Sequence, residues 1–177
     1  MNIGSECRYI SEELDKQVEN VVKLLVQRGL TVATAESCTG GLIAALITSV
    51  PGASDVFGLG ICTYSNNMKC KFLGVQEDEL CRYGAVSSQV ALSMVKGLAE
   101  CSGADICVSV TGIAGPDGGS EEKPVGTVWF GFFVRGKVFT RLPKLWELAD
   151  KSRSNIRMSA AKYAFGVIME VLMEEVQ

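Results

Sequence analysis

Residues 34–50, TAESCTGGLIAALITSV, restrict the fold of this chain more than any other stretch. The first of them predict the end of a strand. After the two glycines, apolar residues recur at the three- and four-residue spacing of one helical face, and alanines leave the other faces small. Backbone from neighbouring elements can approach such a helix closely. The stretch therefore predicts a strand, a short polar turn and a tightly packed helix in direct succession.

Two hydroxyl side chains, Ser37 and Thr39, lie in the predicted turn. The first backbone N–H groups of a helix lack partners within the helix, and the helix dipole favours negative charge there. The turn therefore suits an anion. A simpler interpretation is that Thr39 or Ser37 only caps the helix. These residues alone leave both interpretations open.

The composition predicts one folded domain. The chain has 177 residues, of which 47% are hydrophobic and 21% charged, which is too apolar for a disordered protein. The net charge of −3 and the pI of about 5.1 provide no general attraction for a nucleic-acid backbone or an anionic membrane. We expect no nucleic-acid partner and no membrane partner. Any phosphate-bearing ligand must be held by local groups.

The sequence also predicts a cytoplasmic location. The N-terminus carries charged residues where a signal peptide needs an apolar core. Residues 37–54 contain no charged side chain, but glycines and Pro51 interrupt this run, and its strongly apolar part is too short to span a membrane.

Histidine and cysteine usage restrict the chemistry. The chain has no histidine, which excludes Ser-His-Asp and Cys-His catalysis and histidine-ligated zinc, so any hydrolysis needs another base. The seven cysteines form no C-x-x-C pair and predict reduced thiols. Cys38 has a functional alternative, because a helix N-terminus lowers the pKa of a thiol and makes it more nucleophilic.

Hydrophobic periodicity and turn residues predict alternating strands and helices. Strands are expected at 30–35, 56–64 and 105–110, a hairpin at 127–134 and 137–141, and helices at 11–27, 42–50, 65–73, 77–82, 87–101 and 156–171. This order predicts an α/β fold, a three-layer α-β-α sandwich with a mixed sheet. We expect a single domain over 1–177, with an N-terminal helix at about 10–28 and a core at about 30–175.

A long polar loop follows the third predicted strand. Residues 111–126, TGIAGPDGGSEEKPVG, are rich in glycine and proline, and loops after strands commonly carry the sites of α/β proteins. The helix start at Thr39-Gly40-Gly41 and the backbone amides of residues 112–119 are two candidate anion cradles. A surface loop without function explains the composition of 111–126 equally well. No P-loop and no G-x-G-x-x-G fingerprint is present.

Six motifs occur in order along the chain. They are AESCTGGLIAALIT at 35–48, VPGASDVF at 50–57, YSNNMKCKFLGV at 64–75, GAVS at 84–87, TGIAGPDGG at 111–119 and KPVGTV at 123–128. Together they closely resemble the CinA C-terminal-domain family, the bacterial nicotinamide mononucleotide deamidases. The resemblance covers about residues 31–157.

This resemblance implies hydrolysis of the carboxamide of nicotinamide mononucleotide to nicotinic acid mononucleotide and ammonia, without a metal or a cofactor. It implies that Ser37 is the nucleophile and that Lys69 and Thr111 are active-site residues. A serine hydroxyl is a weak nucleophile until a base takes its proton, and a lysine held neutral can replace the missing histidine. Lowering a lysine pKa from about 10.4 to about 7 costs about 4 to 5 kcal/mol. A solvated lysine beside Lys71 is the alternative interpretation of Lys69.

Further residues are expected to bind the substrate. Amides at the helix start would stabilise an oxyanion, Thr111 and Tyr64 would donate to the carboxamide or orient Lys69, and Arg153 would pair with the phosphate. An ion pair at the start of a helix is the alternative for Arg153. The expected substrate-binding set is Thr39, Gly40, Gly41, Tyr64, Gly112, Gly115 and Arg153.

The chain departs from the family pattern at two places. Tyr83 stands where the family often has a histidine, and residues 149–153, ADKSR, replace a glycine-aspartate-arginine run. These departures favour, as an alternative, a catalytically weak or inactive nucleotide-binding regulatory module; a purely structural interaction domain explains less. We expect a stand-alone version of the domain that forms a homo-oligomer, with a dimer as the first expectation.

Overall fold

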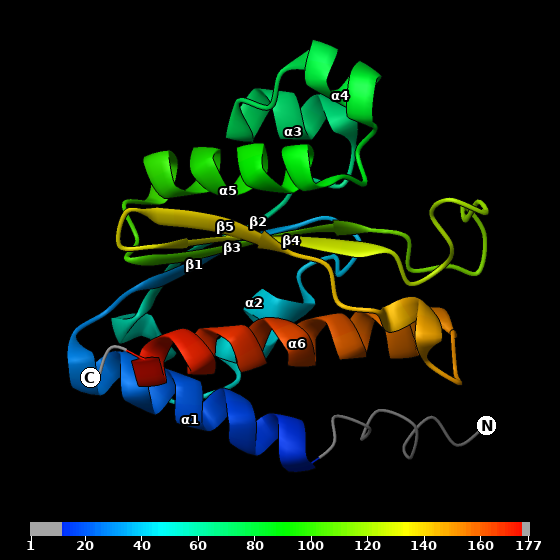
Figure 1. The fold of residues 1–177 in the computed structure, drawn as a ribbon. Coiled ribbons are helices and arrows are strands. Elements are labelled where there is room, and N and C mark those ends of the chain that lie inside the picture. The colour runs from blue at the N-terminus through cyan, green and yellow to red at the C-terminus, as the bar shows by residue number, and fades with distance from the viewer. Residues whose placement is uncertain (1–11, 175–177) are drawn as a thin grey trace, which may run out of the picture.

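A five-stranded mixed sheet forms the centre of the computed structural model, which describes residues 12–174 (Figure 1). The strands are β1 Val32–Glu36, β2 Phe57–Cys62, β3 Ile106–Gly112, β4 Val128–Val134 and β5 Lys137–Arg141, in the spatial order β2-β1-β3-β4-β5. Strand β1 pairs parallel with β2 and β3, whereas β4 pairs antiparallel with β3 and β5. A short hairpin turn suffices for the antiparallel pair, while each parallel pair needs a crossover.

Helices cover both faces of the sheet (Figure 1). One face carries α1 Glu12–Arg28, α2 Leu42–Thr48 and α6 Arg153–Glu174; the other carries α5 Ser88–Ser102, on which α3 Asn66–Leu73 and α4 Glu77–Tyr83 pack. Short 3-10 helices lie at Ala53–Asp55 and Leu145–Glu147. A separate hydrophobic cluster fills the space on each side of the sheet. The predicted three-layer α-β-α sandwich with a mixed sheet is confirmed.

Local sequence signals explain where the helices begin and end. Ser65 and Ser87 cap α3 and α5, because their hydroxyls accept hydrogen bonds from backbone N–H groups in the first turns. Gly74 ends α3 in the left-handed conformation that favours glycine. The expected elements agree with the observed ones to within a few residues. The boundaries that were predicted at residues 10, 11 and 175 lie outside the described residues.

The carboxyl ends of the three parallel strands lie at one edge of the sheet. Hydrogen bonds continue beyond the strands there: Ser37 N donates to Val110 O, and Thr63 N donates to Glu36 O. The long loop after β3 projects from the same edge (Figure 1). Ligands of open α/β sheets bind outside the carboxyl ends of strands, so this edge is the place to search for a site.

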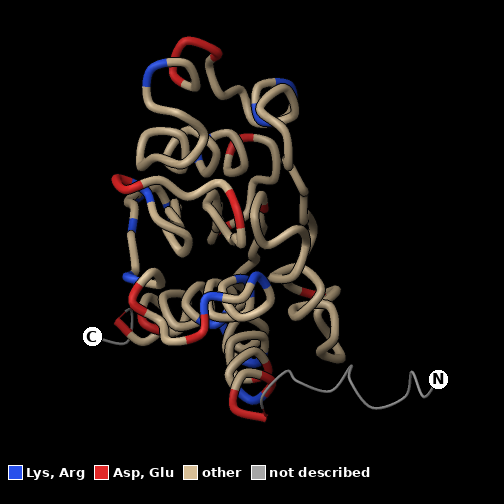
Figure 2. The backbone as a smooth tube through the Cα atoms, turned by 90° about the vertical axis from the view of Figure 1, so that its right-hand side faces the viewer, with Lys and Arg blue, Asp and Glu red and all other residues tan. Residues whose placement is uncertain are grey.

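The described residues contain no candidate membrane span. None of their helices combines the length and the apolar character needed to cross a membrane. Lysine, arginine, aspartate and glutamate are dispersed along the chain on the side that Figure 2 shows.

Helix α5 approaches α3 closely at Gly97. A Cβ atom added to Gly97 would lie 1.9 Å from the backbone oxygen of Leu73, whereas one added to Gly166 in α6 would lie 3.6 Å from the nearest side-chain atom, Gln17 Nε2. Backbone atoms cannot yield as a flexible side chain does, so of these two helical glycines only Gly97 is sterically required.

We expect Gly97→Ala to lower the free energy of unfolding by about 3 kcal/mol, because α5 must move away from α3. Gly166→Ala is the matched control and should raise it by about 0.5 to 1 kcal/mol, since alanine is the better helix former. Urea denaturation followed by circular dichroism measures both changes. Equal stability of the two variants would contradict the close approach.

Candidate active site

A cavity of about 210 Å³ opens at the carboxyl edge of the sheet. The residues that line it come from the turn after β1, from α3 and its approach, from the α4–α5 connection, from the end of β3 with its loop, and from the start of α6. They are Ser37, Cys38, Tyr64, Asn66, Lys69, Ala85, Val86, Thr111, Gly112, Ala114 and Arg153. A larger hollow of about 570 Å³ lies beside β5 and the end of α6, but its lining contains no serine, threonine or cysteine.

The structure brings Ser37 and Lys69 together in this cavity. Lys69 Nζ lies 3.0 Å from Ser37 Oγ, although the two residues are 32 positions apart in the sequence. The amine also donates to the backbone oxygen of Thr63 at 2.8 Å and, more weakly, to that of Tyr64 at 3.5 Å. Only 1% of Lys69 is exposed. The alternative of a solvated lysine is therefore wrong.

The surroundings of Lys69 make its charged form less favourable than it is in water. Within residues 12–174, no carboxylate forms a salt bridge with its amine. Burial lowers the pKa of Lys69 from 10.5, because desolvation penalises the ammonium, while the nearby thiols of Cys38 and Cys70 oppose the shift. A neutral amine can direct its two N–H groups at the carbonyls of Thr63 and Tyr64. In the structure the amine donates to Ser37 Oγ, and a neutral amine at the same position can instead accept a hydrogen bond from the hydroxyl.

Glu36 anchors the start of α2 by hydrogen bonds, and the sequence analysis did not identify this role of Glu36. Its carboxylate is buried, and it accepts hydrogen bonds from Ala44 N at 2.8 Å and Ile43 N at 3.1 Å. Both amides belong to the first turn of α2, so these two N–H groups are not free for an anion. The expected anion cradle at Thr39-Gly40-Gly41 stays a prediction. Ser37 and Thr39 do not cap α2 either, since its N-cap is Gly41 without a side-chain hydrogen bond. The one sequence signal for this role was a charged residue, Glu36, at the end of a strand that was predicted to be buried.

Thr39, Gly40 and Gly41 shape the turn and do not line the cavity. Gly40 and Gly41 have φ angles of 61° and 88°, the left-handed region that glycine adopts without strain. The backbone oxygen of Thr39 accepts from Arg157 Nη2 at 2.7 Å and Nε at 3.2 Å. These three residues lie behind Ser37, where Arg157 fixes the backbone, and their expected contacts with a substrate stay a prediction.

Thr111 lies in the cavity, but its hydroxyl already has an acceptor. Thr111 Oγ1 donates to the backbone oxygen of Ala85 at 2.8 Å. The expected donation to a substrate would require this bond to break. In the observed state the hydroxyl oxygen can only accept a hydrogen bond from a ligand. Gly112 follows at the cavity lining, packed so tightly that an added Cβ would lie 2.7 Å from Thr127 O.

Arg153 is held at the edge of the cavity by two neutral groups. It donates from Nη2 to the hydroxyl of Tyr64 at 2.7 Å and from Nη1 to the backbone oxygen of Gly115 at 2.9 Å. Gly115 does not line the cavity and acts through this carbonyl. Within the described part of the chain Arg153 forms no salt bridge, so the alternative of a helix-start ion pair is wrong. Its charge remains available to an anionic ligand.

Comparison with known proteins identifies the family. The sequence model of the CinA C-terminal domain matches residues 14–172. The chain belongs to the CinA C-terminal domain family. The crystal structure of the competence/damage inducible protein CihA from Agrobacterium tumefaciens agrees with this CinA fold at a TM-score of 0.85 and 40% identity, covering 89% of this chain and 94% of that chain.

The relatives of this CinA domain differ in length. Nicotinamide-nucleotide amidohydrolase PncC of Escherichia coli K12 is 45% identical over 163 residues, which cover 92% of this chain and 96% of that protein. A CinA-like protein of Kosmotoga olearia is 49% identical over 155 residues, covering 88% of this chain. The chain spans only 37% of the length of that longer relative.

The buried thiol of Cys38 is a poor nucleophile in this CinA domain. Burial raises the pKa of Cys38 from 9.0 to about 12, and the carboxylate of Glu36 adds to the rise. Only 6% of the residue is exposed. The expectation that the helix N-terminus activates Cys38 is therefore wrong, because Glu36 occupies that terminus. Residues 12–174 contain no group of three or more cysteine, aspartate or glutamate side chains that could hold a metal ion.

We expect iodoacetamide at about pH 8 to label the exposed thiols of Cys81 and Cys101 in the native protein and to leave Cys38 unlabelled, because almost no thiolate forms there. Mass spectrometry of the digested protein measures each site. Unfolding in urea before labelling is the control and should expose Cys38. Native labelling of Cys38 as fast as that of Cys81 would contradict its assignment as an inert thiol.

Proposed function

We propose that this CinA domain is an amidohydrolase that converts nicotinamide mononucleotide to nicotinic acid mononucleotide and ammonia. The observation that carries the proposal is the distance of 3.0 Å between Lys69 Nζ and Ser37 Oγ, in a pair that is buried at the lining of a cavity. The name of the PncC relative, which matches over nearly its whole length, supports the choice of a nicotinamide nucleotide as substrate.

Ser37 is the proposed nucleophile and Lys69 the proposed base. The neutral amine of Lys69 takes the hydroxyl proton while Ser37 Oγ attacks the carboxamide carbon, which gives a tetrahedral intermediate with an oxyanion. The resulting ammonium is held by the carbonyls of Thr63 and Tyr64. The same ammonium then protonates the leaving nitrogen, so that ammonia departs and an acyl-serine remains.

Water completes the reaction. Lys69 removes a proton from the water molecule that attacks the acyl-serine, and the proton returns to Ser37 Oγ as the ester bond breaks. The products are the free hydroxyl and the carboxylate of nicotinic acid mononucleotide. Because Glu36 already occupies the Ile43 and Ala44 amides, the remaining candidate oxyanion donors include the backbone of the turn, Gly112 and the side-chain amide of Asn66. One good donor of this kind is worth about 2.7 to 4 kcal/mol.

Substrate orientation is assigned to Thr111 and Arg153. The hydroxyl oxygen of Thr111 can accept a hydrogen bond from the carboxamide NH₂ while it donates to Ala85. The guanidinium of Arg153, at the cavity edge beside the exposed ring of Tyr64, suits the phosphate as a bidentate donor.

We expect Ser37→Ala to lower ammonia release from nicotinamide mononucleotide about a thousandfold or more, with an unchanged thermal midpoint. Cys38→Ala is the matched control at the next residue and should retain most of the turnover. An enzyme-coupled ammonia assay measures both. Full turnover by Ser37→Ala would overturn the serine mechanism, and loss only in Cys38→Ala would transfer the role to the thiol.

The rate should rise with pH, because the base must be neutral. Burial lowers the pKa of Lys69 from 10.5, so we expect kcat/KM to increase as pH rises through an ionisation below that value. Lys71→Ala, which changes an exposed neighbour on the same helix, should keep this profile, whereas Lys69→Arg should abolish turnover since arginine stays protonated. A kcat/KM that falls with rising pH would contradict the assignment of Lys69 as base.

The alternative of a nucleotide-binding regulatory module makes a different prediction for the same sample. Tight binding of the mononucleotide in calorimetry, without ammonia release from a well-folded protein, would select it. The assembled Ser37–Lys69 pair supports the enzyme, because binding alone does not need a buried base beside a hydroxyl. The cytoplasmic location and the dimer remain predictions.

A further inference from the structure

Four consecutive backbone oxygens beside the cavity each accept a hydrogen bond from a side chain. Residues 83–86, called the wall segment here, connect α4 to α5, and Ala85 and Val86 line the cavity. Lys123 Nζ donates to Tyr83 O at 3.1 Å and to Val86 O at 2.9 Å, Ser87 Oγ donates to Gly84 O at 2.9 Å, and Thr111 Oγ1 donates to Ala85 O at 2.8 Å. Tyr83 is the last residue of α4, and residues 84–86 belong to no helix or strand, so the side-chain donors define the conformation of the segment where α4 ends.

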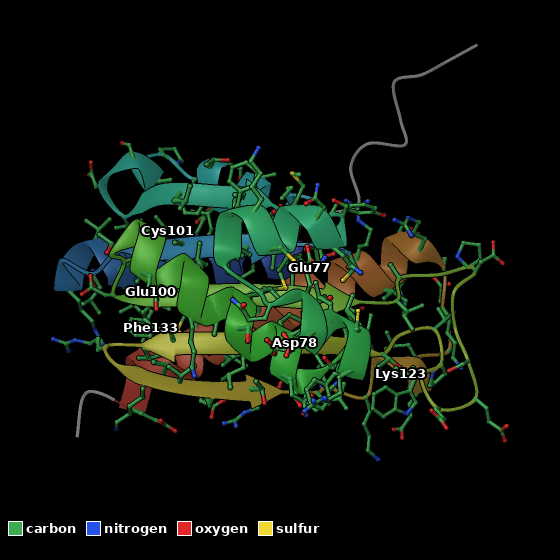
Figure 3. All side chains as sticks on the ribbon, turned by 90° about the horizontal axis from the view of Figure 1, so that it is seen from above. Glu77, Asp78, Glu100, Cys101, Lys123 and Phe133 are labelled. Carbon is green, nitrogen blue, oxygen red and sulfur yellow. The ribbon has the colours of Figure 1, made fainter. Side chains whose placement is uncertain are left out.

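Lys123 is the donor that spans the wall segment. Its amine bridges the first and the last carbonyl of the segment, while Ser87 and Thr111 each hold one carbonyl between them. In Figure 3 the side chain of Lys123 lies on the side of the molecule where the long loop projects, near α4. The contact with Tyr83 goes to its backbone, so it does not depend on which side chain stands at position 83.

The loop that carries Lys123 is itself ordered by local hydrogen bonds. Lys123 N donates to Ser120 Oγ at 3.0 Å, and Ser120 N donates to Lys123 O at 2.9 Å. At its base, Ile113 N donates to Thr127 O and Gly126 N donates to Ile113 O, both at 2.9 Å. Lys123 therefore joins two segments that are far apart in sequence, an anchored loop after β3 and the wall segment.

We propose that Lys123 is a positioning residue, which fixes the Ala85–Val86 wall of the cavity against the Ser37–Lys69 pair. This inference rests on the proposed function and assigns a role to a residue that does not itself line the cavity. Ser37 and Lys69 are held by β1 and α3, and their contact does not involve Lys123. Removal of the amine therefore loosens the wall that confines the substrate and leaves the nucleophile and the base in place.

The test compares Lys123→Met, which keeps the length of the side chain but has no donor, with Lys123→Arg, which keeps a cation with several donors. Lys23→Met is the control, since Lys23 forms only an exposed pair with Glu19 on α1. Loss of hydrogen bonds that hold the substrate equally in the ground state and the transition state raises KM and spares kcat.

We expect Lys123→Met to raise KM about tenfold with kcat within about twofold of wild type, because charged hydrogen bonds of this kind are lost. Lys123→Arg should restore KM to within about threefold of wild type, since two donors remain. Lys23→Met should change neither constant. An unchanged KM in Lys123→Met, or an equal rise in Lys23→Met, would overturn the inference.

Hydrogen exchange gives a readout that does not need turnover. Peptides that cover residues 83–87 and 113–126 should exchange faster in Lys123→Met than in wild type, whereas peptides from α1 should not change. Absence of ammonia release from the wild-type protein would reject the proposed function alone. Unchanged exchange in these peptides would reject the role of Lys123, whatever the activity.

Discussion

The contact between the buried amine of Lys69 and the hydroxyl of Ser37 is the interaction on which the site depends. A lysine that is 1% exposed and lacks a carboxylate partner within residues 12–174 is costly to keep charged. Hydrogen bonds from the Lys69 amine to the backbone oxygens of Thr63 and Tyr64 offset part of this desolvation cost. The same desolvation that opposes the ammonium lowers the pKa of Lys69. In the proposed mechanism, burial gives this amine the role that an imidazole has in many other hydrolases.

The parallel part of the sheet explains why this contact can form. Strand β1 lies between β2 and β3, so the turn that carries Ser37 leaves the sheet next to the segment that leads into α3 and next to the end of β3. Glu36 joins the end of β1 to the first turn of α2, and Arg157 fixes the same turn from α6. Ser37 is therefore held by elements on both sides of the turn.

Two parts of the cavity lining, the α4–α5 connection and the side chain of Arg153, are held in place by hydrogen bonds of side chains and not by the hydrogen bonds of a helix or strand. Thr111 and Lys123 hold the connection between α4 and α5, and Tyr64 and Gly115 hold Arg153. These contacts link the motifs that the CinA family shares across the sequence. A site of this kind has one rigid side, formed by strand ends, and one side whose shape depends on a few hydrogen bonds.

The sequence by itself determined the layers, the mixed sheet, most element boundaries and the family. Helical and strand periodicities, serine caps and glycine stops are local signals. The ordered motifs pointed to Ser37, Lys69 and Thr111, whereas Arg153 was expected from its place near the start of the last helix. Only the tertiary structure decided that Lys69 is buried, that burial raises the pKa of Cys38, and that the Thr111 hydroxyl has Ala85 as its acceptor. It also decided that Glu36, and not Ser37 or Thr39, occupies the start of α2. Desolvation and hydrogen-bond partners are set by residues remote in the sequence, and no local pattern encodes them.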